Sequence, residues 1–336
     1  MEQELTSARK KAHIDLAFQS QVSQIQTDTR FYYEPVLASH PTEISFPTPF
    51  VGRELNAPLW VSSMTGGTEM AGTINRNLAR ACQKFGMGMG LGSCRIVLDS
   101  DEYLPDFALR GLIGDNLPFY ANLGIAQVEE LLAQGRIDKI TQLIHKLNAD
   151  GLIMHINPMQ EWLQPEGDKI QHPPIDTIKR VLDKLDIKLI VKEVGQGMGP
   201  KSLEALFMLP LQAVEFAAIG GTNFAKLELI RGSESNTDLY QDLSYVGHTA
   251  SEMVDFTNDV LTRLGNKALC QQVIISGGVK GFLDGHYLLE KINCPAVYGQ
   301  ASGFLKHATD TYEVLEYYIE KQLQGLALAK AFLTVK

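Results

Sequence analysis

The stretch Gly151-Leu-Ile-Met-His-Ile-Asn157 is an apolar run that ends in polar residues, and seven comparable runs occur along the chain. Short apolar runs of this kind are typical of buried parallel strands. The other runs cover residues 58–64, 86–92, 118–124, 187–194, 213–219, 272–276 and 295–300. Helical patterns separate many of them, most clearly at 71–85, 137–148, 176–185, 201–208, 249–264, 282–290 and about 310–331. Eight strand–helix units predict an α/β fold, a closed (β/α)8 or TIM barrel.

An open, doubly wound sheet is the alternative architecture. It would need a switch in strand order, and the sequence has no G-x-G-x-x-G turn that opens a helix after the first strand. Residues 1–57 precede the first predicted strand, and we expect them to form an extension, with a helix at 5–18 and a hairpin at about 36–50, that packs on a barrel of residues 58–336. Two long polar segments, 158–174 and 222–248, follow the fourth and sixth strands; for 232–238 a disordered insertion is an equal alternative.

Composition limits the classes of function. The net charge of −9 argues against a nucleic-acid partner, and it requires basic groups to be concentrated locally if the ligand is anionic. The four cysteines (Cys82, Cys94, Cys270, Cys294) have no metal-binding spacing and fit a reducing compartment. The polar N-terminus does not resemble a signal peptide, and no apolar run reaches the roughly 20 residues of a membrane helix. We therefore predict a cytoplasmic protein with no membrane and no nucleic-acid partner.

Small residues follow the last predicted strands. In TIM barrels the loops after strands seven and eight commonly bind phosphate through backbone N–H groups. Gly277 and Gly278 follow strand seven, Gln300 and Ala301 follow strand eight, and Gly220-Gly-Thr222 follows strand six. Glycines that only make tight turns are the alternative, but three such loops together favour a phosphate site.

Lys192 lies near the end of the apolar strand Leu189–Val194. A buried ammonium group needs a negative partner, and the ring of a reduced flavin can provide one. The alternative, an ion pair with Glu193, is disfavoured because neighbours on a strand point to opposite faces.

His155 and Asn157 share one face of strand four, and Gln160 and Glu161 follow in the next loop. A satisfied core histidine is the plain interpretation of His155 alone, but four polar groups within seven residues favour a catalytic cluster. Glu161 is a candidate Mg²⁺ ligand, because Mg²⁺ often binds one carboxylate together with substrate phosphates.

The basic residues that an anionic ligand would require occur in separate places along the chain. Arg9, Lys10 and His13 lie close together on the N-terminal helix, and Arg95 follows the second strand. For Arg9 and Lys10 the alternative is a solubilising start to the helix.

Several motifs together resemble one family, the flavin-dependent type 2 isopentenyl-diphosphate Δ-isomerases, over nearly the whole chain. The two most discriminating are Arg9-Lys-x-x-His13 and His155-x-Asn-Pro-x-Gln-Glu161. The others, which recur more widely, are Ser63-Met-Thr-Gly-Gly67, Gly92-Ser-x-Arg95, Asn122-Leu-Gly124, Lys192-Glu-Val-Gly-x-Gly197, Gly220-Gly-Thr222 and Ser276-Gly-Gly278.

The resemblance implies a role for each matching position. Residues that would bind FMN are Ser63, Met64, Thr65, Ser93, Asn122, Lys192, Thr222, Gly277, Gly278, Gln300 and Ala301. Residues that would bind the substrate diphosphate or line its pocket are Arg9, Lys10, His13, Arg95, His155, Asn157 and Gln160. Glu161 would bind Mg²⁺, and Gln160, Lys192 and His155 would be catalytic. Homotetramers or homo-octamers are usual in the family.

The implied reaction is a 1,3-proton shift from isopentenyl diphosphate to dimethylallyl diphosphate, with reduced FMN, Mg²⁺ and NAD(P)H as the reductant. Two alternatives remain. An FMN-dependent 2-hydroxy-acid oxidase would carry a His-Gly-x-Arg segment where this chain has Ala218-Ile-Gly-Gly-Thr222. A flavin-binding protein without turnover, such as a redox sensor, is opposed by the intact Gln160-Glu161 pair.

Overall fold

The computed structural model describes residues 2–63, 68–232 and 239–336. The chain forms two compact units, residues 1–38 with 332–336 and residues 39–331, and each is described by itself. The first unit contains helix α1 (Glu2–Leu16) and a two-stranded antiparallel sheet of β1 (Phe31–Tyr33) and β12 (Leu333–Val335). The second unit contains the barrel.

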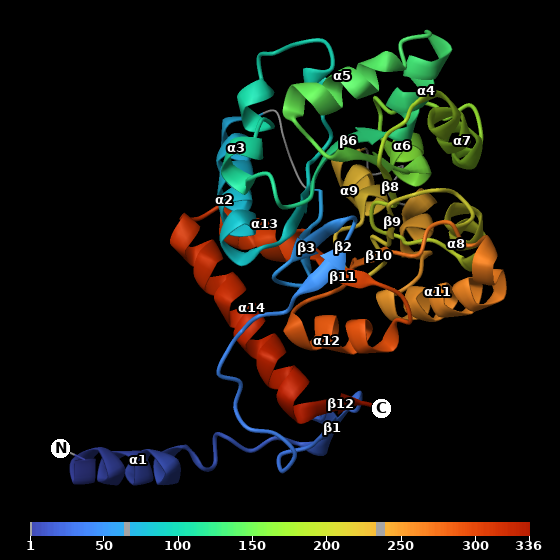
Figure 1. Cartoon of the computed structure of the whole chain (residues 1–336). Helices are drawn as coiled ribbons and strands as arrows, with labels where there is room; N and C mark the ends of the chain where they lie inside the picture. Colours follow the sequence, from blue (N-terminus) through green and yellow to red (C-terminus); the bar gives the residue numbers. More distant parts are fainter. Residues whose placement is uncertain (1, 64–67, 233–238) are drawn as a thin grey trace. The chain divides into compact units, whose positions relative to one another are not determined.

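Eight parallel strands close on themselves in the order β10-β11-β4-β5-β6-β7-β8-β9 (Figure 1), which confirms the predicted TIM barrel. Each strand lies inside the run predicted for it and is shorter than that run. The strands are β4 (Leu59–Val61), β5 (Gly88–Gly90), β6 (Phe119–Gly124), β7 (Gly151–His155), β8 (Leu189–Lys192), β9 (Ala213–Glu215), β10 (Val273–Ser276) and β11 (Ala296–Gln300).

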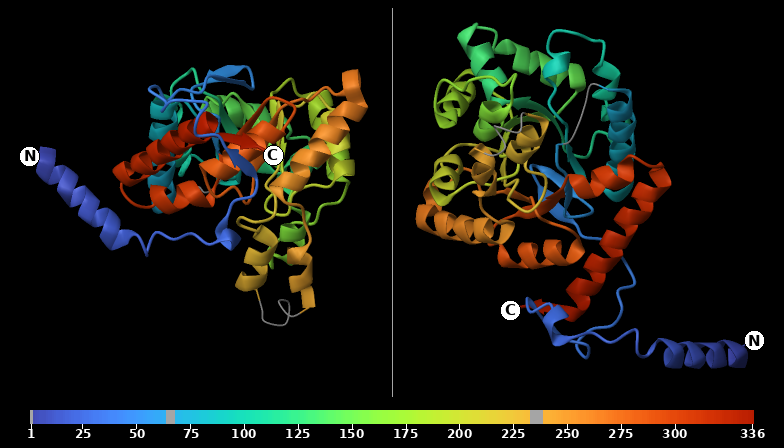
Figure 2. Two further views of the ribbon diagram at one scale, coloured as in Figure 1. Left: turned by 90° about the horizontal axis from the view of Figure 1, so that it is seen from below. Right: turned by 180° about the vertical axis from the view of Figure 1, so that it is seen from behind.

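Helices lie outside the ring of strands in the views from below and behind (Figure 2). Those that the sequence predicts are α2 (Glu69–Phe85), α5 (Asp138–Leu147), α7 (Pro174–Lys184), α8 (Pro200–Phe207), α11 (Ala250–Leu264), α12 (Phe282–Lys291) and α14 (Tyr312–Phe332). Shorter helices that it missed are α3 (Arg110–Ile113), α4 (Ile125–Ala133), α6 (Pro158–Leu163), α9 (Phe224–Arg231) and α13 (Ser302–Ala308). Two of the missed helices, α6 and α9, lie within the segments predicted as long loops.

Side-chain alternation along the strands divides the core into two parts. One set of side chains fills the barrel interior, and the other set packs under the surrounding helices. The interior set contains Trp60, Tyr120, Ile153, Ile190, Ala213, Ile274 and Val297, all of them fully buried. Because every second residue points inward, the next inward positions toward the strand C-termini are those of Ser62, Asn122, His155, Lys192, Glu215 and Ser276.

The N-terminal end of the barrel is closed by a hairpin of β2 (Thr48–Phe50) and β3 (Arg53–Leu55). The predicted hairpin at about 36–50 is therefore wrong in position, because the turn falls at Val51-Gly52, where both residues have positive φ. Phe50, Val51 and Leu55 pack in the same cluster as the barrel interior.

A charged network lies at the same end. Asp150, which precedes β7, accepts hydrogen bonds from Arg53 (2.8 Å), Arg110 (2.8 Å) and the backbone N–H of Phe119 (2.9 Å). Burial alone would raise the pKa of Asp150, but the hydrogen bonds from the two arginines outweigh it and lower that pKa below its usual value. The remaining Arg110 donors bind the carbonyl oxygens of Asn148, Gly114 and Leu117.

Within the described residues, no helix combines the length and the apolar character that crossing a membrane requires.

Candidate active site

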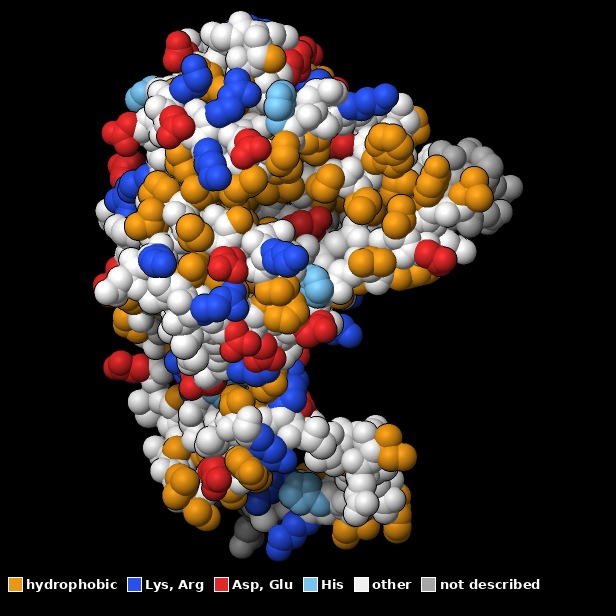
Figure 3. Space-filling model, turned by 90° about the vertical axis from the view of Figure 1, so that its right-hand side faces the viewer, with side chains coloured by type: hydrophobic (Ala, Val, Ile, Leu, Met, Phe, Trp, Pro, Cys, Tyr) orange, Lys and Arg blue, Asp and Glu red, His pale blue; other side chains and the backbone are white. Residues whose placement is uncertain are grey.

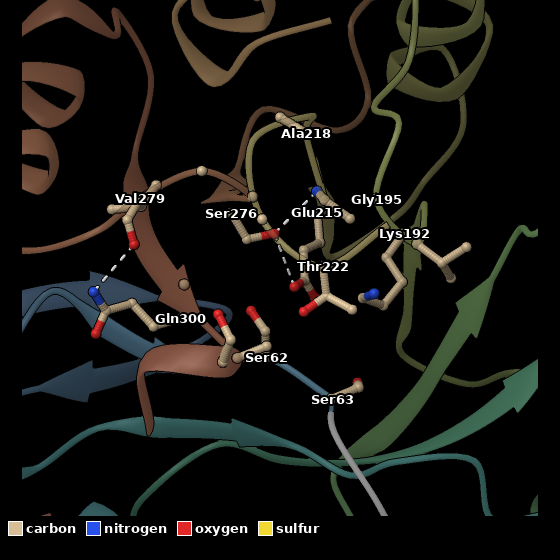
Figure 4. Close-up of a pocket in the computed structure, with 18 of the residues that line it drawn as sticks. Ser62, Ser63, Lys192, Gly195, Glu215, Ala218, Thr222, Ser276, Val279 and Gln300 are labelled. Atoms are coloured by element: carbon tan, nitrogen blue, oxygen red, sulfur yellow. Dashed lines mark hydrogen bonds between the residues drawn. The ribbon is translucent and has the colours of Figure 1, made fainter. Parts of the chain in front are cut away.

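A cavity opens at the C-terminal ends of β4 and of β8 to β11 (Figure 4). It brings together seven of the residues predicted to bind a cofactor: Ser63, Lys192, Thr222, Gly277, Gly278, Gln300 and Ala301. It also contains residues to which the sequence analysis gave no role, notably Ser62, Glu215 and Ser276. In TIM barrels this end carries the active site.

The other described residues that were predicted to bind the cofactor do not line the cavity. Asn122 contacts a residue that lines the cavity, because its Nδ2 donates a hydrogen bond to Ser63 Oγ at 2.8 Å. Ser93 is exposed and does not line the cavity. Met64 and Thr65 lie outside the described residues.

The glycine loops after β9 and β10 pack directly on one another. A Cβ atom at Gly277, which has a φ of 86°, would overlap the backbone of Ala218. A Cβ atom at Gly221 would lie 3.2 Å from the backbone nitrogen of Gly278. Close backbone packing is therefore one reason for glycine at these positions, and it adds to any role in binding phosphate.

Lys192 is buried, and its Nζ donates to the carbonyl oxygen of Glu193 at 2.7 Å. The Glu193 carboxylate points away from it and accepts the backbone N–H groups of Gly195 (2.6 Å), Gln196 (2.6 Å) and Gly197 (3.0 Å). Burial raises the pKa of Glu193 above its usual value, although the three hydrogen bonds act to lower that pKa. The ammonium group thus lies in the cavity without an ion pair to Glu193, as the strand geometry predicts.

Two buried polar atoms in the cavity have no hydrogen-bond partner within the described chain: Ser62 Oγ and Glu215 Oε2. Native proteins rarely leave such atoms unsatisfied unless a ligand or water binds them. The ammonium group suits the negative charge of a cofactor such as FMN, and the hydroxyl and carboxylate can bind its polar N–H and O–H groups.

His155 ends β7, where it pairs in register with Lys192 on β8. Its Nδ1 lies 2.7 Å from Asn122 Oδ1. Burial, helped by the positive charge of Lys192, lowers the pKa of His155 to about 3. The imidazole is therefore neutral at pH 7, with the proton on Nδ1 and the Nε2 lone pair free.

Asn157, Gln160 and Glu161 form a hydrogen-bonded group at the start of α6. Asn157 Nδ2 donates to Gln160 Oε1 (3.1 Å) and to Glu161 Oε1 (2.9 Å). Gln160 and Glu161 thus lie on a helix and not in a loop, because Pro158 begins α6 at its first position, where proline is favoured. Asn157 Oδ1 is buried and lacks a partner among the described atoms.

Glu228 on α9 is a functional candidate that the sequence analysis missed. Its side chain is buried, and its Oε1 accepts a hydrogen bond from Gln160 Nε2 at 3.4 Å. Arg231 Nη1 lies 2.9 Å from its other oxygen. The available sequence signal was Asn223, which caps α9 by accepting from the N–H of Lys226 at 2.9 Å. Recognising that helix would have placed Glu228 on a structured element.

Arg95 is exposed and already binds a carboxylate, with Nη1 2.9 Å from Asp168 Oδ2. The backbone N–H of Asp168 donates to Glu161 Oε2 at 2.8 Å. Asp168 therefore connects Arg95 to the α6 group. An anionic ligand that binds Arg95 would compete with this carboxylate.

The remaining predicted substrate residues, Arg9, Lys10 and His13, are exposed on α1 in the first unit. In the described part of the chain, no group of three or more His, Cys, Asp or Glu residues has metal-binding geometry. Glu161 alone is compatible with Mg²⁺ if water molecules and a bound ligand supply the other oxygen atoms.

A second cavity lies outside this cluster. It is mainly apolar and is lined by Ile156, Met159, Ile175, Met198 and Leu206, among others. Hydrophobic side chains form a band around a hollow on the face seen in Figure 3.

The fold is shared with flavoenzymes. A variant of flavocytochrome b2 with sulfite bound matches with a TM-score of 0.61 and 13% identity, over 90% of this chain and 72% of that one. A mandelate oxidase variant with an FMN adduct matches with a TM-score of 0.55 and 10% identity, over 91% and 88%. At these identities the likeness shows the fold, a TIM barrel of the kind found in those enzymes.

The chain matches no protein-family model. Relatives with similar sequences nevertheless identify its family. Isopentenyl-diphosphate delta-isomerases of Rickettsia felis and Nostoc sp. are each 33% identical to it, over 93% of this chain and 88% and 87% of theirs. That of Chlorobium chlorochromatii is 35% identical over 83% of this chain and 81% of its own. The chain belongs to the isopentenyl-diphosphate delta-isomerase family, as the motifs predicted.

Proposed function

We propose that the protein isomerises isopentenyl diphosphate to dimethylallyl diphosphate, with FMN bound in the cavity at the end of the barrel. The observation that carries the proposal is the arrangement of His155, Asn157, Gln160 and Glu161 beside the Lys192 cavity, in a chain of this family. Bound FMN, in its reduced form, would supply an electron-rich ring that stabilises positive charge and takes part in proton transfer.

The residues that line the cavity would bind different parts of the cofactor. Lys192 would contact the polar edge of the ring, while Ser62, Ser63 and Gln300 would bind other parts of the cofactor. The loops that carry Gly277, Gly278 and Ala301 offer backbone N–H groups for its phosphate. FMN fits these residues because the cavity combines a buried ammonium group with an unpartnered hydroxyl.

Moving a proton in the substrate requires an ionisable group near the reacting carbons. Gln160 is an amide and a poor acid, so it can orient or relay but not supply the proton. Glu228, which accepts a hydrogen bond from Gln160, is the ionisable group that the geometry places next to it. Neutral His155 adds no positive charge that would oppose a developing carbocation.

The substrate diphosphate would bind at the α6 end of the site. Arg95 would exchange the Asp168 carboxylate for a phosphate group. Glu161 would hold Mg²⁺ together with the diphosphate oxygens, and His155, Asn157, Arg9, Lys10 and His13 are further proposed contacts. NAD(P)H would reduce the flavin. A cytoplasmic homotetramer or homo-octamer is the expected assembly, and exposed apolar side chains such as Trp162 offer surface for it.

The test is to supply FMN, Mg²⁺ and isopentenyl diphosphate to the protein under anaerobic reducing conditions and to follow dimethylallyl diphosphate. Glu161→Gln should lower turnover about 100-fold at limiting Mg²⁺ and leave the flavin spectrum unchanged. The control Glu130→Gln changes an exposed carboxylate on α4, away from these residues, and should keep near-normal turnover. Flavin binding without product in the unmodified protein would contradict the proposed reaction.

A further inference from the structure

Glu215, at the end of β9, carries the one carboxylate among the described residues that line the cavity. Its side chain is completely buried. Oε1 accepts a hydrogen bond from Ser276 Oγ at 3.0 Å, and Ser276 Oγ itself accepts from the backbone N–H of Ala217 at 3.0 Å. Oε2 has no partner within the described chain. A carboxylate buried in this way is costly unless a positive group or a donor lies close by.

The positive group on hand is Lys192. Lys192 and Glu215 are register partners on the neighbouring strands β8 and β9, and both side chains extend into the same cavity (Figure 4). Among the described lining residues, Lys192 is the single Lys or Arg. Its Nζ donates to the carbonyl oxygen of Glu193, which leaves further ammonium protons for other acceptors. The neighbouring carboxylate of Glu193 is occupied by backbone N–H groups.

We propose that Glu215 is a positioning residue for Lys192 in the flavin site: no ion pair joins the two side chains among the described contacts, but the carboxylate attracts the ammonium group across the shared cavity and offsets its charge. A bound flavin then experiences less positive charge than Lys192 alone would supply. Since positive charge near the ring favours the anionic reduced flavin, Glu215 keeps the reduction potential of the cofactor lower. The inference rests on FMN binding, which is part of the proposed function.

The test is the two-electron reduction potential of FMN bound to the purified protein. Glu215→Gln keeps the shape of the side chain and removes its charge. The variant should bind reduced FMN about tenfold more tightly relative to oxidised FMN, a rise of about 30 mV in potential. Glu215→Asp, which restores the charge, should stay near the unmodified protein. Ser276→Ala is the matched control, because it removes the hydrogen bond to Oε1 without changing charge, and it should move the ratio less than threefold.

A double variant tests whether Glu215 acts on the flavin through Lys192. If Glu215 acts through Lys192, Glu215→Gln should change the potential much less when Lys192→Met is already present.

Three results would overturn the inference. An unchanged potential with equally weakened binding of both redox forms would mean that Oε2 only binds a neutral group of the cofactor. A lower potential would mean that Glu215 directs Lys192 toward the ring. A protein that binds no FMN would overturn both this inference and the proposed function, whereas the first two results leave the proposed function intact.

Discussion

The two ends of the barrel differ in how their buried carboxylates are hydrogen-bonded. At the N-terminal end, Asp150 has partners for both of its oxygens in Arg53, Arg110 and the N–H of Phe119. At the C-terminal end, Ser62 Oγ, Glu215 Oε2 and Asn157 Oδ1 have none within the described residues. A satisfied network stabilises the fold, whereas unsatisfied atoms that face a cavity indicate a place for a ligand. Because other buried atoms, such as Tyr120 Oη in the barrel interior, also lack a partner among the described residues, it is their position on the cavity that marks Ser62 and Glu215 as functional candidates.

The largest effect on stability is expected at the satisfied end. Asp150→Asn removes the charge that two arginines share and leaves Arg110, whose side chain is 10% exposed, without its ionic partner. We expect the free energy of unfolding to fall by about 3 kcal/mol. Urea titration monitored by circular dichroism measures the change. A loss below about 1 kcal/mol, on the scale of an exposed ion pair, would show that this network does not hold the end of the barrel together.

A smaller, pH-dependent effect is expected at His155. The folded protein binds its proton only near pH 3, whereas an unfolded histidine binds it near pH 6.5. Between these values the unfolded state binds more protons, so stability rises with pH and is lost as the pH falls. From pH 7 to pH 5 the loss from this one group is at most about 2 kcal/mol.

Replacing the histidine isolates this contribution. His155→Gln should flatten the difference between urea titrations at pH 7 and pH 5. The control His145→Gln replaces an exposed histidine on α5 and should leave the difference unchanged. Equal pH dependence in the His155 variant and the unmodified protein would mean that the ring can be protonated in the folded state.

The smallest effect on stability is expected at the unsatisfied end. Ser62→Ala removes a buried hydroxyl that has no partner in the chain, so the free energy of unfolding should change by no more than about 0.5 kcal/mol. Ser276→Ala, which removes a hydroxyl with two partners, should cost about 1–2 kcal/mol. Comparable losses in the two variants, measured by urea titration, would contradict the contrast between satisfied and unsatisfied groups.

Much of the fold follows from local sequence patterns. Eight apolar runs predicted eight strands because burial on both faces of a parallel strand leaves a continuous signal. Helices α6 and α9 were missed because each is only six to eight residues long, too short for a helical period to emerge. Their start signals, Pro158 and Asn223, were present in the sequence.

The site was predictable only in part. The cluster from His155 to Glu161 is local in sequence, so its density of polar groups was visible. The contact between Gln160 and Glu228 joins positions 68 residues apart, and only the folded barrel brings them together. Glu215 had a local signal, since a carboxylate within the apolar strand Ala213-Val-Glu-Phe216 needs a reason to be buried. Its unpartnered oxygen became evident only in the structure.

A crystal structure of the protein with FMN tests the central claim most directly, namely that the unsatisfied C-terminal end of the barrel is the cofactor site. We predict that FMN occupies the cavity between β4 and β8 to β11, with its ring beside Lys192 and a hydrogen bond to Ser62 Oγ. A flavin bound elsewhere on the chain, with this cavity filled only by water, would contradict the account.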